Sequence, residues 1–156
     1  METIYKCDDL DLGNINYSEP RKVGTIYYSD INYNGNPLFI QTSKLKNKSD
    51  TENMNLKKPS ELKFEVDDKI YNFFNNLDNK NINTIFDNSK EWFSKQLRFQ
   101  DSENMYKNMT KSLTKNKSPE IKIKLPAENG KLLSKIYNQE KIDIDLKDIK
   151  NNQECI

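Results

Sequence analysis

The central part of the chain has the most regular pattern of apolar and polar positions. Apolar residues recur there with spacings of three and four, which is typical of helices that bury one face. A first set consists of Ile70, Phe73, Phe74 and Leu77, and a second of Ile82, Ile85, Phe86, Trp92, Phe93 and Leu97. Asp67 or Asp68 can cap the first helix, and the polar run at 78–81 predicts a break. The pattern predicts a helical pair over 67–97, with Trp92 as an anchor in the core.

Shorter segments before and after this helical region alternate between apolar and polar residues, as half-buried strands do. We expect a strand at 22–33 and its partner at 38–44. A tight turn at Asn34-Gly35 joins them, because these residue types tolerate positive φ. The alternation at 61–66 predicts a third strand, and the polar residues before it predict a loop.

The C-terminal third returns to the alternating pattern. In residues 120–125 the apolar Ile121, Ile123 and Leu125 alternate with Glu120, Lys122 and Lys124. One side of this strand should therefore face a core and the other side solvent. Asn129-Gly130 predicts a second hairpin that leads into 131–137, and 141–146 is a candidate last strand.

These elements describe a mainly β protein with a helical insertion, which is an α+β fold. Several small barrels have such an order of elements, and the pattern does not choose among them. We expect residues 1–20 to be a flexible N-terminal arm and 21–146 to be a single domain with its helical insertion at 67–97. Residues 147–156 are expected to form a C-terminal tail.

Composition excludes several kinds of site. The 156 residues suffice for one ordinary domain. The chain has no histidine, and its two cysteines, Cys7 and Cys155, lie at opposite ends, so Cys/His zinc sites and histidine-based catalysis are excluded. Asp143 and Asp145 share one side of a candidate strand but have no third ligand nearby, so no metal is expected. No apolar run is long enough for a membrane span, and there is no secretion signal.

Charge is balanced overall but uneven along the chain. Twenty-five basic and 24 acidic side chains leave a net charge of +1, so an anion-binding role must rest on local patches. Residues 107–124 form one such patch, because they contain six lysines and a single acid, Glu120. A solvated face and a phosphate-binding surface both fit this patch.

The tyrosines of residues 22–45 have two interpretations. Such aromatic residues fill sheets and form cross-strand pairs, but exposed rings also stack on nucleobases. Neighbouring residues of a strand point to opposite faces, so Tyr27 and Tyr28 cannot both face a ligand. Tyr27 and Tyr33 share their side with Val23 and are expected in the core. Tyr28 is therefore the stacking candidate.

The order of three segments resembles a protein family of nucleo-cytoplasmic large DNA viruses. The segments are YYSDINYNGNPLFIQTSKL at 27–45, NSKEWFSKQL at 88–97, and SPEIKIKLP at 118–126, which an Asn-Gly hairpin follows. The resemblance covers roughly residues 22–137, and its most specific part is the spacing of PLFIQT at 37–42 to NSKEWF at 88–93. Members of this family are proposed relatives of the single-stranded DNA-binding protein of podoviral phages and have an OB-fold. The resemblance thus implies an OB-like small β-barrel.

Two departures from the family pattern concern the end of the barrel. Ser43 stands where a proline is common, and relatives continue with further strand material beyond the position of Ile156. The resemblance therefore leaves open whether the barrel is complete at its C-terminus.

The leading hypothesis is non-enzymatic binding of single-stranded DNA during viral genome replication, recombination or repair. Aromatic stacking and lysine–phosphate contacts need neither a catalytic group nor a cofactor. The expected binding residues are Tyr28, Phe39, Lys44, Lys107, Lys111, Lys122 and Lys124.

The expected partners are single-stranded DNA and viral replication proteins. Binding of RNA and formation of homo-oligomers are left open, and no membrane association is expected. The expected location is the viral factory or nucleus of an infected cell, without secretion. The alternative is a virion structural or scaffold protein that uses the same sheet for protein contacts.

Overall fold

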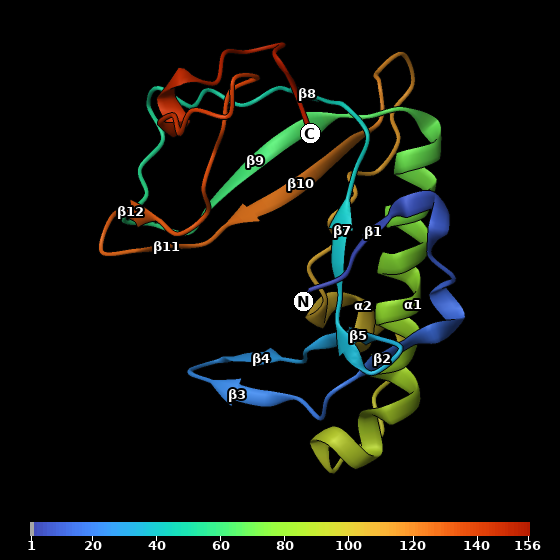
Figure 1. Cartoon of the computed structure of the whole chain (residues 1–156). Helices are drawn as coiled ribbons and strands as arrows, with labels where there is room; N and C mark the ends of the chain where they lie inside the picture. Colours follow the sequence, from blue (N-terminus) through green and yellow to red (C-terminus); the bar gives the residue numbers. More distant parts are fainter. Residues whose placement is uncertain (1) are drawn as a thin grey trace. The chain divides into compact units, whose positions relative to one another are not determined.

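Short strands make up much of the regular structure in the computed structural model, which describes residues 2–156 (Figure 1). In these residues two α-helices accompany five separate sheets, so the α+β class is confirmed. None of the five sheets closes into the OB-like barrel that the resemblance implies. The chain divides into two compact units, whereas the sequence predicted a single domain over 21–146. Unit one comprises Met1–Thr42 and Asn75–Asn108, and unit two comprises Ser43–Phe74 and Met109–Ile156.

The elements follow one another closely along the chain. Unit one contains β1 (Ile4–Lys6), η1 (Cys7–Asp9), η2 (Leu12–Asn14), β2 (Ile15–Tyr17), β3 (Arg21–Val23), β4 (Ile26–Tyr28), β5 (Ile31–Tyr33), β6 (Asn36–Pro37), β7 (Phe39–Gln41) and α2 (Phe99–Met105). Unit two contains β8 (Leu45–Asn47), β9 (Ser60–Glu65), β10 (Glu120–Leu125), β11 (Ala127–Glu128), β12 (Lys131–Leu132), η3 (Leu146–Asp148) and β13 (Glu154–Cys155). Helix α1 (Asp68–Phe93) contributes its first residues to unit two and the rest to unit one.

The N-terminal residues contain two paired strands where the sequence predicted a flexible arm. Strand β1 runs parallel to β7, and β2 pairs with β5 in a three-stranded sheet. The ring of Tyr5 packs edge-on against that of Tyr33, with 4.8 Å between the centroids. Ile15 and Tyr33 are both buried. These apolar contacts join residues distant in sequence, so the alternation within residues 1–20 alone did not reveal them.

The turn at Asn34-Gly35 is confirmed, but the strands around it are shorter than predicted. Asn34 and Gly35 have φ values of 49° and 81°, and they join β5 directly to β6. The strand predicted at 22–33 is instead divided into β3, β4 and β5. Gly24, with φ of 63°, permits a turn that folds β4 back on β3. Strand β7 pairs with β1 rather than with the predicted partner strand.

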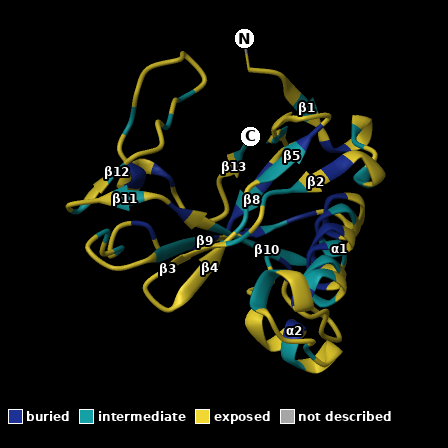
Figure 2. Ribbon diagram, turned by 90° about the horizontal axis from the view of Figure 1, so that it is seen from below, coloured by how far each residue is buried: buried dark blue, intermediate teal, exposed yellow. Residues whose placement is uncertain are grey.

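Helix α1 is continuous where the sequence predicted two helices. Asp67 caps it as expected, since its carboxylate accepts a hydrogen bond of 2.8 Å from the backbone N–H of Ile70. The polar run at 78–81 lies inside the helix, and two of its members, Asp78 and Asn81, are buried. They continue the spacing of three and four residues that begins at the apolar positions, so the buried face of α1 includes polar side chains. Buried parts of α1 are dark blue in Figure 2.

Two tyrosines satisfy these buried polar groups. The hydroxyl of Tyr17 donates to Asn81 Oδ1, the Asn81 amide donates to the Tyr106 hydroxyl at 2.9 Å, and that hydroxyl donates to Asp78 Oδ1 at 2.8 Å. Burial is the main cause that raises the pKa of Tyr17 and Tyr106, because it disfavours the phenolate. Both hydroxyls therefore keep their protons at neutral pH and remain hydrogen-bond donors.

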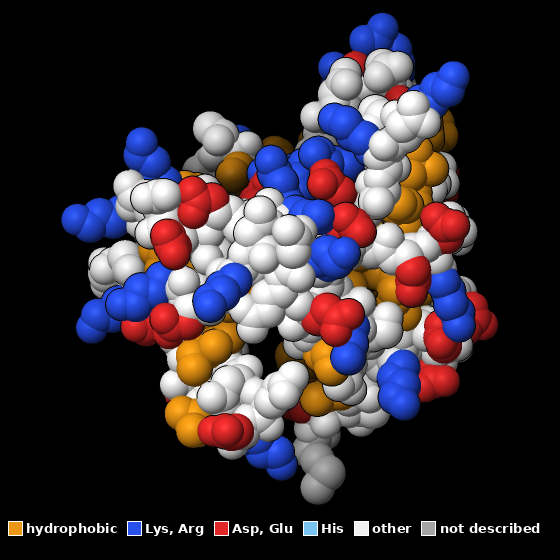
Figure 3. Space-filling model, turned by 90° about the horizontal axis from the view of Figure 1, so that it is seen from above, with side chains coloured by type: hydrophobic (Ala, Val, Ile, Leu, Met, Phe, Trp, Pro, Cys, Tyr) orange, Lys and Arg blue, Asp and Glu red, His pale blue; other side chains and the backbone are white. Residues whose placement is uncertain are grey.

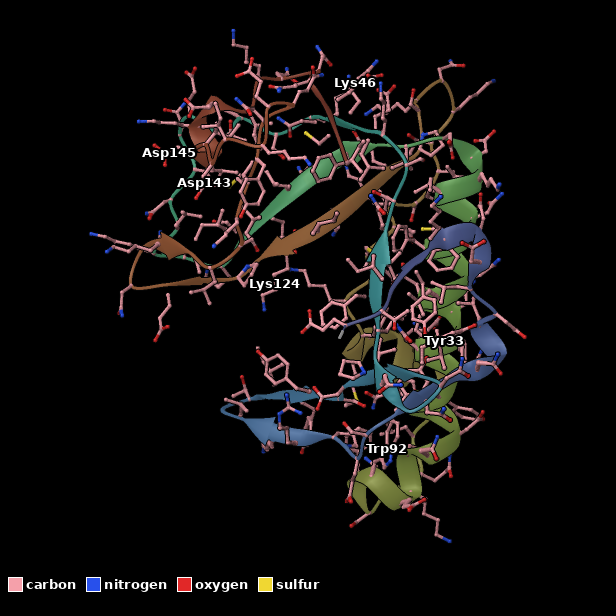
Figure 4. The ribbon with its side chains drawn as sticks, viewed as in Figure 1. Tyr33, Lys46, Trp92, Lys124, Asp143 and Asp145 are labelled. Atoms are coloured by element: carbon pink, nitrogen blue, oxygen red, sulfur yellow. The ribbon has the colours of Figure 1, made fainter. Side chains whose placement is uncertain are left out.

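Trp92 is only partly buried near the C-terminal end of α1, so it is a weaker anchor than the sequence predicted (Figure 4). Its ring lies edge-on to that of Phe93, with 6.4 Å between the centroids. The fully buried residue at this end is Ser89, whose hydroxyl donates to Phe86 O and accepts from the backbone N–H of Leu97. Ser89 thereby ties the segment after α1 back to the helix.

We predict that Trp92→Ala lowers the free energy of unfolding by about 2 kcal/mol, which is less than the roughly 3 to 5 kcal/mol typical of a fully buried large aromatic residue. The reason is that part of the indole already contacts water in the folded state. Urea unfolding followed by circular dichroism measures this difference, with Trp92→Phe as the control. A loss as large as that of a fully buried residue would contradict the observed exposure.

Unit two is built on an antiparallel sheet in the order β10-β9-β8-β13, of which β8, β9 and β10 are labelled in Figure 1. The strands predicted at 61–66 and 120–125 are confirmed as β9 and β10, which pair over six residues. Their apolar residues share one face, on which Leu62, Phe64, Ile121 and Leu125 are buried. The Asn129-Gly130 hairpin is also confirmed, because it joins β11 to β12 with positive φ at both residues.

The last part of the chain differs from the prediction. Residues 141–146 form no strand apart from one bridge between Tyr137 and Asp143. Residues 147–156, expected as a tail, include β13, which pairs with β8. The side chain of Asn47, which is 0% exposed, holds this segment. Its amide donates to the carbonyls of Ser49 and Lys150, and its oxygen accepts from the backbone N–H of Ser49.

Candidate functional site

The hairpin of β3 and β4, in unit one, is the most exposed regular structure among the predicted binding segments. All eight residues from Arg21 to Tyr28 are exposed, as the predominantly yellow ribbon in Figure 2 shows. The two strands pair only with each other among residues 2–156. We call residues 21–28 the aromatic hairpin.

The register of the aromatic hairpin separates its two tyrosines. Tyr28 lies opposite Arg21 and shares its face with the pair formed by Val23 and Ile26. Tyr27 lies opposite Lys22 on the other face. Its ring packs edge-on against Phe93 at 5.0 Å, and Lys22 Nζ lies 5.5 Å from the ring centroid, within cation–π range. Tyr27 thus attaches the hairpin to the end of α1, and Tyr28 is the tyrosine without such a ring contact.

This arrangement corrects part of the sequence interpretation. Tyr27 was expected in the core with Val23, but Tyr27 is 42% exposed and Val23 lies on the face of Tyr28. The turn at Gly24 causes the difference, because it interrupts the alternation on which the shared side was based. The stacking candidate Tyr28 is 38% exposed, and Tyr33 is buried as expected.

Arg21 is held by an acidic partner. Its guanidinium donates to both carboxylate oxygens of Asp30, at 2.7 and 3.1 Å. The hydrogen bond from Arg21 is the main cause that lowers the pKa of Asp30. This bidentate pair fixes the base of the aromatic hairpin and neutralises most of the charge that Arg21 could offer to a phosphate.

Phe39, the second predicted aromatic binding residue, lies on a different ribbon of unit one. It is 39% exposed and lies beside Ile4 in the parallel register of β1 and β7. Lys6 and Gln41 form the next pair on the same face, two residues further along. Phe39 is therefore accessible to a ligand, with one lysine close to it.

The predicted lysines are distributed over both units. Lys107 belongs to unit one, and Lys44, Lys111, Lys122 and Lys124 belong to unit two. Lys44 and Lys111 pair with acids, since Lys44 Nζ lies 3.2 Å from Glu154 and Lys111 Nζ lies 2.6 Å from Glu120. The basic patch expected at 107–124 is thus partly neutralised by Glu120. Figure 3 shows basic and acidic side chains interspersed over the face that it draws.

Lys122 and Lys124 project from a rigid element, as predicted. They lie on the solvent face of β10, opposite the face that carries Ile121. Figure 4 shows Lys124 near the C-terminal end of this strand. Lys63 of β9 is directly opposite Lys122, so it belongs to the same group. Lys63 was not among the lysines expected to bind, although the alternation of residues 61–66 already places it on the solvent side of its strand.

Residues 2–156 contain no cluster of three or more acidic or cysteine side chains that could hold a metal ion. Asp145 is used locally, since it forms a capping box with Asp148 around η3. No helix in this described part of the chain is long and apolar enough to cross a membrane.

Comparison with known protein families identifies a family that covers most of the chain. A family model described as a family of unknown function, DUF5871, matches residues 48–156, which is about 70% of the chain. The match includes Lys63, Lys122 and Lys124, whereas the aromatic hairpin precedes it. None of the curated proteins or solved structures that were compared matches the chain. On the extent of the family match, the chain belongs to the DUF5871 family.

Proposed function

We propose that this protein binds single-stranded nucleic acid without catalysing a reaction. Bases stack on exposed aromatic side chains, and lysines contact the phosphates. The aromatic hairpin is the observation that carries this proposal, because it presents Tyr28 on an exposed ribbon beside Val23 and Ile26. Every base has a π-face, so such a surface binds single strands with little dependence on sequence.

Lysine–phosphate contacts supply the second part of the proposed binding. Lys122 and Lys124 lie on the solvent face of a sheet strand, where their position is fixed by the pairing of β10 with β9. Phosphate contacts of this kind depend on salt, and stacking does not share that dependence. The two contributions can therefore be measured separately in one titration.

The resemblance to the viral family supports a specific biological role and a specific ligand for this protein. It suggests a role in viral genome replication, recombination or repair, with single-stranded DNA as the main ligand. An OB-like barrel is part of the same proposal, and the sheet β10-β9-β8-β13 is its candidate wall.

Changing Tyr28 tests the stacking contribution. We expect Tyr28→Ala to weaken binding of labelled oligo-dT by about 1 to 3 kcal/mol, as is typical of one lost stacking platform, and to leave the salt dependence unchanged. Fluorescence anisotropy at several salt concentrations measures both quantities. Tyr137→Ala is the matched control, since Tyr137 is also an exposed tyrosine but lies outside the aromatic hairpin.

Equal affinities for the parent, Tyr28→Ala and Tyr137→Ala would remove the aromatic hairpin from the binding surface. Absence of oligo-dT binding by the parent chain itself, with a duplex and single-stranded RNA also unbound, would refute the proposed function.

A protein-binding role is the second candidate, and the exposure of Val23 and Ile26 favours it. These two side chains are 58% and 54% exposed, which is high for β-branched residues that form a cross-strand pair. Strand β4 also carries neither lysine nor proline, the residues that commonly protect an exposed strand edge. If the alternative holds, Val23→Ser with Ile26→Ser will abolish association with a protein partner and leave oligo-dT affinity unchanged.

A further inference from the structure

Two lysines lie opposite each other on β9 and β10 of the unit two sheet. Lys63 of β9 and Lys122 of β10 are direct cross-strand partners on the solvent face. Lys124 is the next residue on the same side of β10. Lys46 and Lys48 form ion pairs with Glu65 on this sheet, and Lys111 forms one with Glu120, but none of these three ion pairs uses Lys63, Lys122 or Lys124.

The hydrogen bonding of the sheet brings Lys63 and Lys122 especially close. The backbone N–H of Lys122 donates away from β9, to the carbonyl of Met109 at 2.7 Å. The carbonyl of Lys63 likewise points away from β10 and accepts from the N–H of Lys48 at 2.8 Å. The two lysines are therefore a non-hydrogen-bonded pair, the type in which opposite residues approach most closely, at about 4.5 Å between Cα atoms.

The neighbouring acidic pair shows that this sheet can neutralise opposed like charges. Glu65 and Glu120 are also direct partners on the solvent face, one step along β9 and β10. Lys48 lies 3.2 Å and Lys46 3.7 Å from Glu65, and Lys111 lies 2.6 Å from Glu120. The acidic pair thus has three basic partners, and none of these three ion pairs includes Lys63 or Lys122.

Like charges directly opposite each other destabilise a sheet. An anion that binds between Lys63 and Lys122 would remove this repulsion, and Lys124 is placed to hold the next anionic group. Glu61 lies opposite Lys124 and is the nearest acid in the register. Six lysines on or beside this face, against three glutamates, leave positive charge in excess.

We infer that Lys63, Lys122 and Lys124 form a phosphate-binding site for an extended phosphodiester backbone that runs along β10. Residues two apart on a strand are separated by about 6.6 Å, so Lys122 and Lys124 can contact two successive phosphates. The site specifies which lysines contact the phosphates of the nucleic acid. It rests on the proposed function for the identity of that ligand. Lys63 is the residue that the sequence-based set of binding lysines did not include. Because it lies on β9, the site extends over both β9 and β10.

The test compares Lys63→Gln and Lys122→Gln with Lys46→Gln in oligo-dT titrations. Lys46 is a matched control because it lies on the same sheet face but next to Glu65. Loss of one phosphate contact should reduce affinity about eightfold at about 0.05 M salt and about threefold at about 0.2 M, and should lower the salt slope by about 0.7. Lys46→Gln should change affinity less than about twofold. Equal losses in all three variants would overturn the site and leave the proposed function standing.

A second measurement separates this inference from the proposed function. Tripolyphosphate, which carries phosphate groups but no bases, is titrated into isotope-labelled protein and followed by NMR. We expect shifts at Lys63, Lys122 and Lys124 in the parent that are lost in Lys63→Gln. If oligo-dT does not bind but these shifts occur, the proposed function fails and the anion site remains. If tripolyphosphate produces no shift at the three lysines, the site is refuted.

Discussion

Replacing Lys122 and Lys124 together with glutamate should lower oligo-dT affinity by more than about 60-fold at about 0.05 M salt, and by about tenfold or more at about 0.2 M. These values follow from the loss of two phosphate contacts, each with a salt slope of roughly 0.7, and the new negative charges add repulsion. Anisotropy titrations across this salt range measure both the affinity and the slope. Folding should be nearly unaffected, because solvent-exposed charges contribute little to stability.

The matched control is Lys115→Glu with Lys117→Glu. These lysines are exposed and lie in the same unit, but they belong to the loop before β10 rather than to the sheet. The control makes the same change in net charge, so it isolates the effect of position. If the two double variants weaken binding equally, the strand lysines have no special role and net charge alone governs the affinity.

The largest expected effect on stability is that of Asn47→Ala. The side chain of Asn47 is 0% exposed and bonds the carbonyls of Ser49 and Lys150 and the N–H of Ser49. Truncation leaves these backbone groups without their partner in the interior, and each such loss costs roughly 1 to 3 kcal/mol. We expect the free energy of unfolding to fall by about 3 kcal/mol or more, as measured by urea denaturation.

Two further variants make this prediction specific. Asn47→Asp keeps the oxygen that accepts from Ser49 but places a carboxylate against two carbonyls, so it should be at least as destabilising as alanine. Asn53→Ala changes an exposed asparagine of the same unit and should cost little. Amide exchange should show that Asn47→Ala opens residues 149–155 first. A loss of less than about 1 kcal/mol would mean that water replaces the amide at this position.

The α+β class and several local elements could be predicted because they depend on local sterics and periodicity. The turns at Asn34-Gly35 and Asn129-Gly130 follow from residues that tolerate positive φ. The cap at Asp67 and the alternation in β9 and β10 need only the chemistry of neighbouring residues. Within the candidate site, the alternation of residues 120–125 predicted Lys122 and Lys124 on a solvent face, and Tyr28, the stacking candidate, is exposed.

Contacts between residues distant in sequence decided the continuity of α1 and the burial of Asn47, which the sequence pattern could not predict. Asp78 and Asn81 predict a helix break by their polarity, but Tyr17 and Tyr106 supply their hydrogen bonds and α1 continues. Asn47 is one of many asparagines in a polar segment, and only the return of the C-terminal chain makes it a buried hydrogen-bonding centre.

The sequence by itself thus determined the alternation of β9 and β10 and the side of these strands on which Lys63, Lys122 and Lys124 lie. Only the tertiary structure decided that Lys63 lies opposite Lys122, since this depends on the register of two strands more than fifty residues apart. It likewise decided that β3 folds against β4 and places Tyr28 beside Val23. The physical reason is that alternation assigns a residue to a face, whereas the choice of partner strand and register depends on packing and backbone hydrogen bonds between distant segments.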